Sequence, residues 1–249
     1  MIQYGVADFG MNMWYGGCYD PEERWAALKK IGYDGIERIY AISADDAMWQ
    51  AAAMRKVGAD FGLCLGPNPA TTIRWTAALG KTYVWTGGGS AKDLDGYCRQ
   101  AGAMAEAAAR FGVTAACHNH MGSPVETQEQ LEEFLRRCPA CGLILDTAHL
   151  AGAGGDALAI ATKYVGRLAA LHLKDYLLQK PDVPMSQWTG RGRFCELGAG
   201  NVGLDNLAVL KAAVAGGFDG WVFIEQDTHL QDPLIDLAKS REYLRKGGF

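Results

Sequence analysis

The residues most able to carry chemistry in this chain follow its short apolar runs. All five histidines lie between residues 118 and 229, and four of them lie in or at the end of the runs VTAACHNH, GLILDTAH and LAALHLKD. These four are His118, His120, His149 and His172. A fourth run, WVFIEQD, delivers Glu225 and Asp227 in the same way. Imidazoles and carboxylates bind divalent metal ions and transfer protons. Their position at the ends of successive strands therefore predicts a metal-assisted site.

Three of these residues are candidate metal ligands. Asp146, His172 and Glu225 each lie at the end of a different apolar run. An aspartate directly after GLIL is costly to bury unless it is paired or bound to a metal ion. Three such groups, with one more from the VTAACHNH run, would hold a divalent ion and leave positions open for substrate oxygens. The alternative is that each group only makes a hydrogen bond within its loop.

The run VTAACHNH ends in His118-Asn119-His120. Side chains alternate along a strand, so the two histidines are predicted to point to one side and Asn119 to the other. One histidine would bind the metal ion, with His118 preferred, while the other orients the substrate or moves a proton. The alternative is a paired-histidine polar cluster in the core.

Further candidates lie beside these positions. Lys174 shares a strand face with His172, and we expect it to neutralise an enolate or donate a proton, its pKa lowered by nearby metal charge. A salt bridge to Asp175 or to another rim carboxylate is the alternative. His149 is expected to hydrogen-bond Asp146 or to contact the substrate. The other predicted substrate contacts are Glu37, Trp14, Arg193 and Glu126, the last of which could instead cap a helix.

The elements that must position these residues alternate regularly. Eight apolar runs are continuous rather than alternating, which is typical of strands buried on both faces of a parallel sheet. They span residues 2–8, 33–39, 60–66, 82–87, 113–120, 142–149, 168–175 and 221–227. Amphipathic stretches follow at 21–31, 45–57, 94–112, 127–137, 156–165, 204–216 and 233–246. The pattern predicts one α/β domain over residues 1–249, a single (β/α)₈ TIM barrel.

One long segment, residues 177–203, lacks a regular pattern. So long a loop inside a compact domain is usually functional, and after the seventh strand it would lie over the mouth of the barrel. Trp188 in this segment is a candidate cover for the site. The alternative is a surface excursion.

Composition limits the function classes. The formal net charge of −4 argues against a nucleic-acid surface, which needs clustered lysine and arginine. No stretch approaches eighteen uninterrupted apolar residues, and the sequence MIQYGVADFGMN lacks the pattern of a signal peptide. Seven scattered cysteines fit a reducing compartment. We therefore expect a cytoplasmic protein without nucleic-acid or membrane partners.

These motifs resemble those of the xylose-isomerase-like barrel superfamily of sugar isomerases, epimerases and related lyases. The resemblance rests on HNHMGSPVET, LDTAHLAGAGGD, LHLKD and EQDTHLQDPL, within residues 113–235, and on GYDGIE at 32–37. Within the superfamily the motifs are most similar to those of the inosose (2-keto-myo-inositol) dehydratases, although this chain is shorter than those enzymes.

The resemblance implies a metal quartet of Glu, Asp, His and Glu, in which Asp146, His172 and Glu225 take three places. The first glutamate, in the superfamily's Glu-Asn-His sequence, is His118 here. In the epimerase branch the two metal-bound carboxylates are also the two bases. A chain that keeps only Glu225 is therefore expected to favour elimination.

The resemblance thus predicts a metal-dependent lyase acting on a keto sugar or ketocyclitol through one divalent ion, Mn²⁺ being preferred to Co²⁺, Mg²⁺ or Zn²⁺. Glu225, His118 or His120 would remove the proton next to the carbonyl, and His120, His149 or Lys174 would protonate the departing β-hydroxyl.

Three alternatives remain, and the closest is an isomerase or epimerase that uses the same metal ion and enediolate. The others are a nuclease of the apurinic-site type, disfavoured by the net negative charge, and a non-catalytic sugar-binding barrel. A homo-oligomer is possible by analogy with related barrels.

Overall fold

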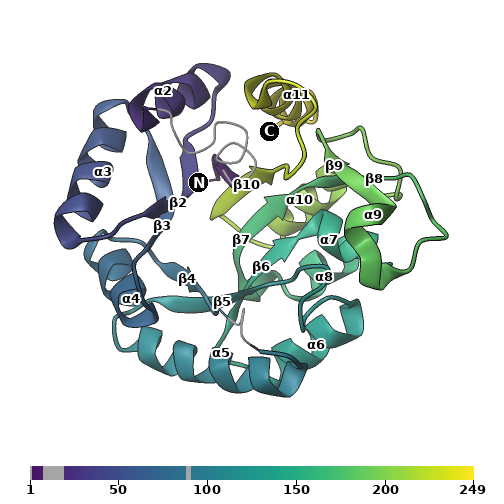
Figure 1. Ribbon diagram of the computed structural model, residues 1–249, viewed down its shortest axis with the longest axis horizontal. Helices are drawn as coiled ribbons and strands as arrows, with labels where there is room; N and C mark the ends of the chain where they lie inside the picture. Colours follow the sequence, from purple (N-terminus) through teal and green to yellow (C-terminus); the bar gives the residue numbers. More distant parts are fainter. Residues whose placement is uncertain (1, 8–19, 88–90) are drawn as a thin grey trace.

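The computed structural model describes residues 2–7, 20–87 and 91–249, and its centre is a barrel of parallel strands (Figure 1). The barrel strands are β1 (Gln3–Ala7), β2 (Gly35–Tyr40), β3 (Asp60–Leu65), β4 (Tyr83–Trp85), β5 (Thr114–His118), β6 (Gly142–Asp146), β7 (Leu168–Leu173) and β10 (Trp221–Glu225). Their order in the sheet is β3-β2-β1-β10-β7-β6-β5-β4, and every pairing is parallel. Because β3 and β4 lie side by side, the sheet nearly closes on itself. The predicted TIM barrel is confirmed.

Helices cover the outside of the barrel between successive strands (Figure 1). They are α2 (Pro21–Ile31), α3 (Ala44–Lys56), α4 (Pro69–Ala78), α5 (Leu94–Ala109), α6 (Gln128–Arg137), α7 (Thr147–Gly152), α8 (Ala157–Lys163), α10 (Asn206–Ala215) and α11 (Pro233–Lys246). A short 3₁₀ helix, Val165–Arg167, precedes β7. In the described part of the chain, no helix combines the length and the apolar character that crossing a membrane requires.

One of these helices, α4, is absent from the sequence prediction. Its apolar residues are too few for a clear period, but its start carries a strong signal. The Asn68 side chain accepts a hydrogen bond from the Thr71 N–H (3.0 Å), and the Thr71 hydroxyl accepts one from the Asn68 N–H (3.2 Å). This capping box, followed by Pro69 in the first turn, fixes the helix that joins β3 to β4.

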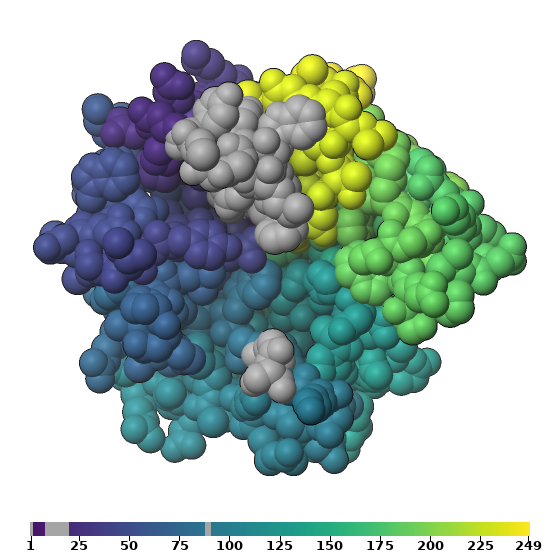
Figure 2. Space-filling view, viewed as in Figure 1, coloured from purple at the N-terminus to yellow at the C-terminus, as the bar shows by residue number. Residues whose placement is uncertain are grey.

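The segment predicted to be irregular, residues 177–203, contains regular structure, and that prediction is wrong. Strands β8 (Asp175–Leu178) and β9 (Gly192–Cys195) form an antiparallel hairpin, with a 3₁₀ turn (Met185–Gln187) and α9 (Trp188–Arg191) between them. Tyr176 stabilises the hairpin in two ways. It pairs with Phe194 across the two strands, and the Tyr176 hydroxyl donates a hydrogen bond to the Trp188 carbonyl (3.1 Å). It lies beside α7 and projects at the edge of the molecule (Figures 1 and 2).

The core has two parts, separated by the sheet. Large side chains fill the barrel, among them Trp221 and Phe223, whose rings stack with centroids 5.1 Å apart. Gly5 makes room for them, since a Cβ there would lie 2.6 Å from the Phe223 ring. A larger apolar cluster fills the space between strands and helices. The polar site therefore rests on a closely packed apolar floor.

Candidate metal centre

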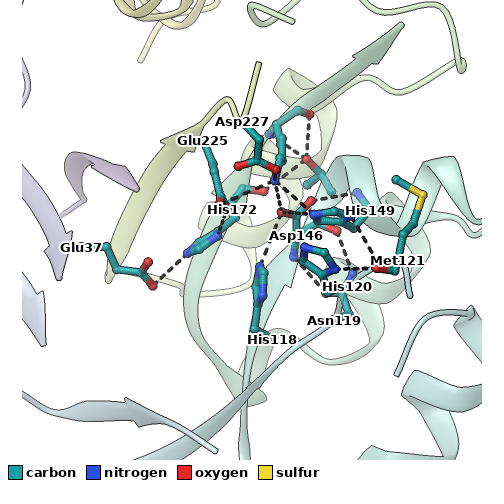
Figure 3. Close-up of polar contacts among 12 residues, drawn as sticks. Glu37, His118, Asn119, His120, Met121, Asp146, His149, His172, Glu225 and Asp227 are labelled. Carbon is teal, nitrogen blue, oxygen red and sulfur yellow. Dashed lines mark hydrogen bonds and ion pairs between the residues drawn. The ribbon is translucent and has the colours of Figure 1, made fainter. Parts of the chain in front are cut away.

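Four side chains predicted as metal ligands meet at the carboxyl ends of the strands (Figure 3). His118 ends β5, Asp146 ends β6, Glu225 ends β10, and His172 precedes the last residue of β7. One donor atom from each lies within 4.8 Å of the others. The structure thus brings together residues separated by more than a hundred positions in the chain, while their role as ligands stays a prediction.

The donor atoms fit a divalent ion. The Nε2 atom of His118 lies 3.5 Å from Oδ2 of Asp146. Both atoms are buried, and neither has a hydrogen-bond partner among the described residues. Buried polar atoms almost always have one, so this pair points to a cation between them. Two imidazoles and two carboxylates are a donor set suited to divalent transition metals.

Asp146 is held in place by its own backbone and by Asn119. The Asn119 amide donates to the Asp146 carbonyl (3.0 Å) and accepts from the Asp146 N–H (2.9 Å), which ties β5 to β6. Oδ1 of Asp146 caps α7 by accepting the His149 N–H (2.8 Å), which leaves Oδ2 facing the cluster. Burial would raise the pKa of Asp146, but the nitrogen groups of His149 and Lys174 lower it. The sequence prediction placed Asn119 away from the histidines but did not foresee this clamp.

His172 lies between two carboxylates. Its Nδ1 is 2.6 Å from Oε2 of Glu225, and its Nε2 is 2.9 Å from Oε1 of Glu37. Burial would lower the pKa of His172, but the two carboxylates outweigh it and raise the pKa to about 10. Glu37 was predicted as a substrate contact on the rim. Instead it is fully buried and directed at His172.

Lys174 supplies a fixed positive charge behind the cluster. It is completely buried, and its Nζ lies 2.7 Å from Asp227 Oδ2 and 3.6 Å from both Asp146 Oδ2 and Glu225 Oε1. Burial would lower the pKa of Lys174, but these carboxylates raise it. The predicted lowering by a bound metal ion stays a prediction.

The sequence left two salt bridges open for Lys174, one to Asp175 and one to another rim carboxylate. The structure shows the second, with Asp227 as the partner. Asp175 instead accepts hydrogen bonds from the N–H groups of Tyr176 and Gly198 (both 2.9 Å).

His120 and His149 form a second pair of rings beside the cluster, with centroids 3.7 Å apart. His120 Nδ1 lies 2.6 Å from the Met121 carbonyl, which can only accept. Nδ1 is therefore the donor of this hydrogen bond, which leaves Nε2 available for another contact. His149 Nε2 lies 3.1 Å from Lys174 Nζ. The edge of Trp188 packs on both histidines, so the hairpin reaches the site as predicted.

Two of the predicted substrate contacts, Glu126 and Arg193, make their hydrogen bonds outside the cluster. The Glu126 carboxylate accepts the Gly122 N–H (2.9 Å) and closes a turn. Arg193 donates to the Phe194 carbonyl (3.3 Å), and strand alternation places it opposite Phe194, which faces His149. Trp14 lies outside the described residues. Their binding roles stay predictions.

A cavity of about 390 Å³ opens beside His118 and His120, within the size range of small-molecule pockets. Trp85 forms one wall and stacks on His118 (centroids 4.6 Å apart). Trp85 is absent from the prediction, although it ends a predicted strand, as the ligands do. A larger cavity, about 560 Å³, lies among Thr82, Thr114 and Gly142 at the opposite, amino ends of the strands. Barrel enzymes place their sites at the carboxyl ends, which favours the smaller cavity.

Polar side chains gathered at the carboxyl ends of a parallel barrel occupy the place where (β/α)₈ barrels carry their functional sites. Residues 70–247 match the family described as Xylose isomerase-like TIM barrel, and the chain belongs to this family.

Individual relatives agree with this assignment. An inosose dehydratase of Lactiplantibacillus plantarum is 27% identical over 163 residues, which are 62% of this chain and 54% of that protein. This chain thus spans about half the length of the curated relatives it matches.

Solved structures show the same fold over nearly the whole chain. The zinc-bound IolI protein has a TM-score of 0.70 and 18% identity, covering 97% of this chain and 96% of its own. An Escherichia coli 3-keto-D-glucoside 4-epimerase, in its apo form, has a TM-score of 0.69 and 17% identity, covering 99% and 100%.

Proposed function

We propose that this chain is a divalent-metal-dependent dehydratase that acts on a ketocyclitol or a keto sugar. The observation that carries the proposal is the cluster of His118, Asp146, His172 and Glu225, with an imidazole at the place of the superfamily's first glutamate. The similarity to inosose dehydratases supports elimination over isomerisation or epimerisation. A cyclic polyhydroxy ketone is the substrate class that these relatives indicate.

We propose Mn²⁺ as the preferred ion, with Co²⁺ and Zn²⁺ as close competitors. Two imidazoles suit these ions better than Mg²⁺, which prefers an all-oxygen shell. When bound, the ion would polarise the substrate carbonyl and lower the cost of removing the proton on the neighbouring carbon.

Elimination needs two proton transfers, and we assign them to different side chains around the cluster. His120 has Nδ1–H fixed on the Met121 carbonyl and lines the 390 Å³ cavity, so its Nε2 is the base that would accept the proton next to the carbonyl. Glu225 is less suited, because its two oxygens already face His172 and Lys174. The Lys174–His149 pair holds the proton that would go to the departing β-hydroxyl, which leaves as water.

The test is a product assay with 2-keto-myo-inositol and Mn²⁺-loaded protein. We expect loss of one water by mass spectrometry, with a new enone or diketone absorbance, and no reaction with Asp146→Asn. A product isomeric with the substrate in ordinary water, which gains one deuterium when the reaction runs in D₂O, would instead establish an isomerase or epimerase. No turnover with any keto sugar, and ligand binding undisturbed by Asp146→Asn, would establish a sugar-binding barrel.

We also propose a cytoplasmic location and a homo-oligomeric state. The six cysteines in the described ranges are free thiols, as expected for a reducing compartment. Light scattering on the purified protein tests the oligomeric state, and fractionation of the source cells tests the location.

A further inference from the structure

Glu37 is a completely buried carboxylate that lies outside the ligand cluster but touches it. It sits on β2, across the barrel mouth from β7, and its Oε1 is 2.9 Å from Nε2 of His172 (Figure 3). A buried carboxylate is costly unless it is paired. The contact with His172, a predicted ligand, offsets part of the cost of burying Glu37.

The two nitrogens of His172 face different surroundings. Nδ1 is 2.6 Å from Glu225, a member of the cluster, whereas Nε2 faces Glu37. The ring can offer a metal ion only one of these nitrogens, and Nδ1 is the one on the cluster side. A carboxylate that accepts the opposite N–H fixes the tautomer and ring orientation of a ligating histidine and raises its basicity.

Glu37 is itself held by two residues of strand β4 and by its neighbour Arg38 on β2. The indole Nε1 of Trp85 donates to Oε1 (3.0 Å), the Tyr83 hydroxyl lies 3.4 Å from the same oxygen, and Arg38 Nε lies 3.3 Å from Oε2. Trp85 and Tyr83 are on β4, so they must reach across β3 to meet β2.

Gly62 on β3 makes that reach possible. A Cβ at this position would lie 2.6 Å from the Tyr83 hydroxyl and 3.0 Å from the Glu37 carbonyl. Because Gly62 has no side chain, there is space for Tyr83 and Trp85 of β4 to contact Glu37 of β2. A Cβ at Gly62 would also lie 3.0 Å from the Phe223 ring, so this glycine makes room both for the apolar interior and for the contacts of Glu37.

We infer that Glu37 is a positioning residue of the metal centre, which holds His172 with Nδ1 toward the ion, and is not a substrate contact. The inference rests on the proposed function, because it needs the cluster to bind a metal ion.

The test measures Zn²⁺ affinity by competition with a chelator for the wild type, Glu37→Gln and Glu37→Ala. Substituting a residue that hydrogen-bonds a metal ligand typically weakens metal binding by about 10- to 100-fold. We expect a loss in that range for Glu37→Ala and a smaller one for Glu37→Gln, which keeps an acceptor of similar shape. Glu132→Gln is the matched control, since Glu132 pairs with Lys163 (2.6 Å) on the outer surface, and it should bind Zn²⁺ like the wild type.

A spectroscopic readout separates positioning from folding. In ¹⁵N-histidine spectra of the Zn²⁺-loaded wild type, we expect coordination of His172 through Nδ1, with a protonated Nε2. Coordination through Nε2 would overturn the inference. Equal Zn²⁺ affinity of the wild type and both folded Glu37 variants, with only the substrate KM changed, would also overturn it. A wild type that binds no Zn²⁺ would overturn the proposed function and, with it, this inference.

Discussion

The ammonium nitrogen of Lys174 lies 2.7 Å from Oδ2 of Asp227, inside the barrel mouth. The lysine is completely buried, whereas Asp227 is partly exposed at the rim. The same nitrogen lies between Asp146 and Glu225, each 3.6 Å away. Lys174 thus compensates three carboxylates at the ends of two strands, β6 and β10.

Replacing this cation should destabilise the fold strongly. Lys174→Met leaves buried carboxylates uncompensated, and breaking a buried ion pair costs about 3–5 kcal/mol of the free energy of unfolding. Urea denaturation of the metal-free protein measures the loss. Lys163→Met, which removes an exposed pair with Glu132, should cost far less of the free energy of unfolding, because solvent screens that pair. Equal losses for the two variants would refute the role assigned to Lys174.

The Asn119 clamp gives a second prediction. Asn119→Ala removes two buried hydrogen bonds to the Asp146 backbone and leaves their partners unsatisfied, which should cost about 2–4 kcal/mol and weaken metal binding. The chain offers a matched control in Asn201, which makes the same two bonds to the Leu178 backbone (2.7 and 2.9 Å) at an exposed position. Asn201→Ala should lose less than about 1 kcal/mol, because water replaces those bonds. Denaturation curves and Zn²⁺ titrations would show both effects.

The proposed base can be separated from the metal ligands. His120→Asn should lower kcat by about 10²- to 10⁴-fold, the usual contribution of a general base, while the metal content stays that of the wild type. His229→Asn is a control, since His229 bonds Asp236 (3.0 Å) away from the cluster. Full activity of His120→Asn would exclude His120 as the base, and loss of the metal ion would make it a ligand.

Metal binding should release a proton. With a pKa raised to about 10 by Glu225 and Glu37, His172 carries a proton at neutral pH that an ion must displace, whereas burial lowers the pKa of His118 and keeps it neutral. Affinity should therefore rise with pH up to about 10. Titration calorimetry in buffers of different ionisation enthalpy should give about one proton released per ion near pH 7. Binding without proton release would contradict the arrangement of His172.

Much of the site was predictable because its residues lie where apolar strands end. His118, Asp146, His172 and Glu225 follow continuous apolar runs, and parallel strands bring their carboxyl ends together whatever the intervening sequence. The sequence pattern did not predict helix α4 or the β8–β9 hairpin, because each is short and weakly periodic. The helix depends on its capping box, and the hairpin depends on pairing between its strands.

Contacts between elements could not be predicted from spacing. Glu37 was placed on the rim because it ends an apolar run, yet its direction is set by Trp85 and Tyr83 reaching over Gly62. The fixed charge state of Lys174 likewise depends on three carboxylates from two other strands. The direction of Glu37 and the charge of Lys174 both depend on packing across the barrel, between residues that lie far apart in the sequence.

Anomalous diffraction at the zinc edge, from crystals soaked in Zn²⁺, tests the central claim most directly. The account predicts one strong peak within about 2.0–2.2 Å of donor atoms from His118, Asp146, His172 and Glu225. No peak at this cluster, or an ion held by other residues, would contradict it.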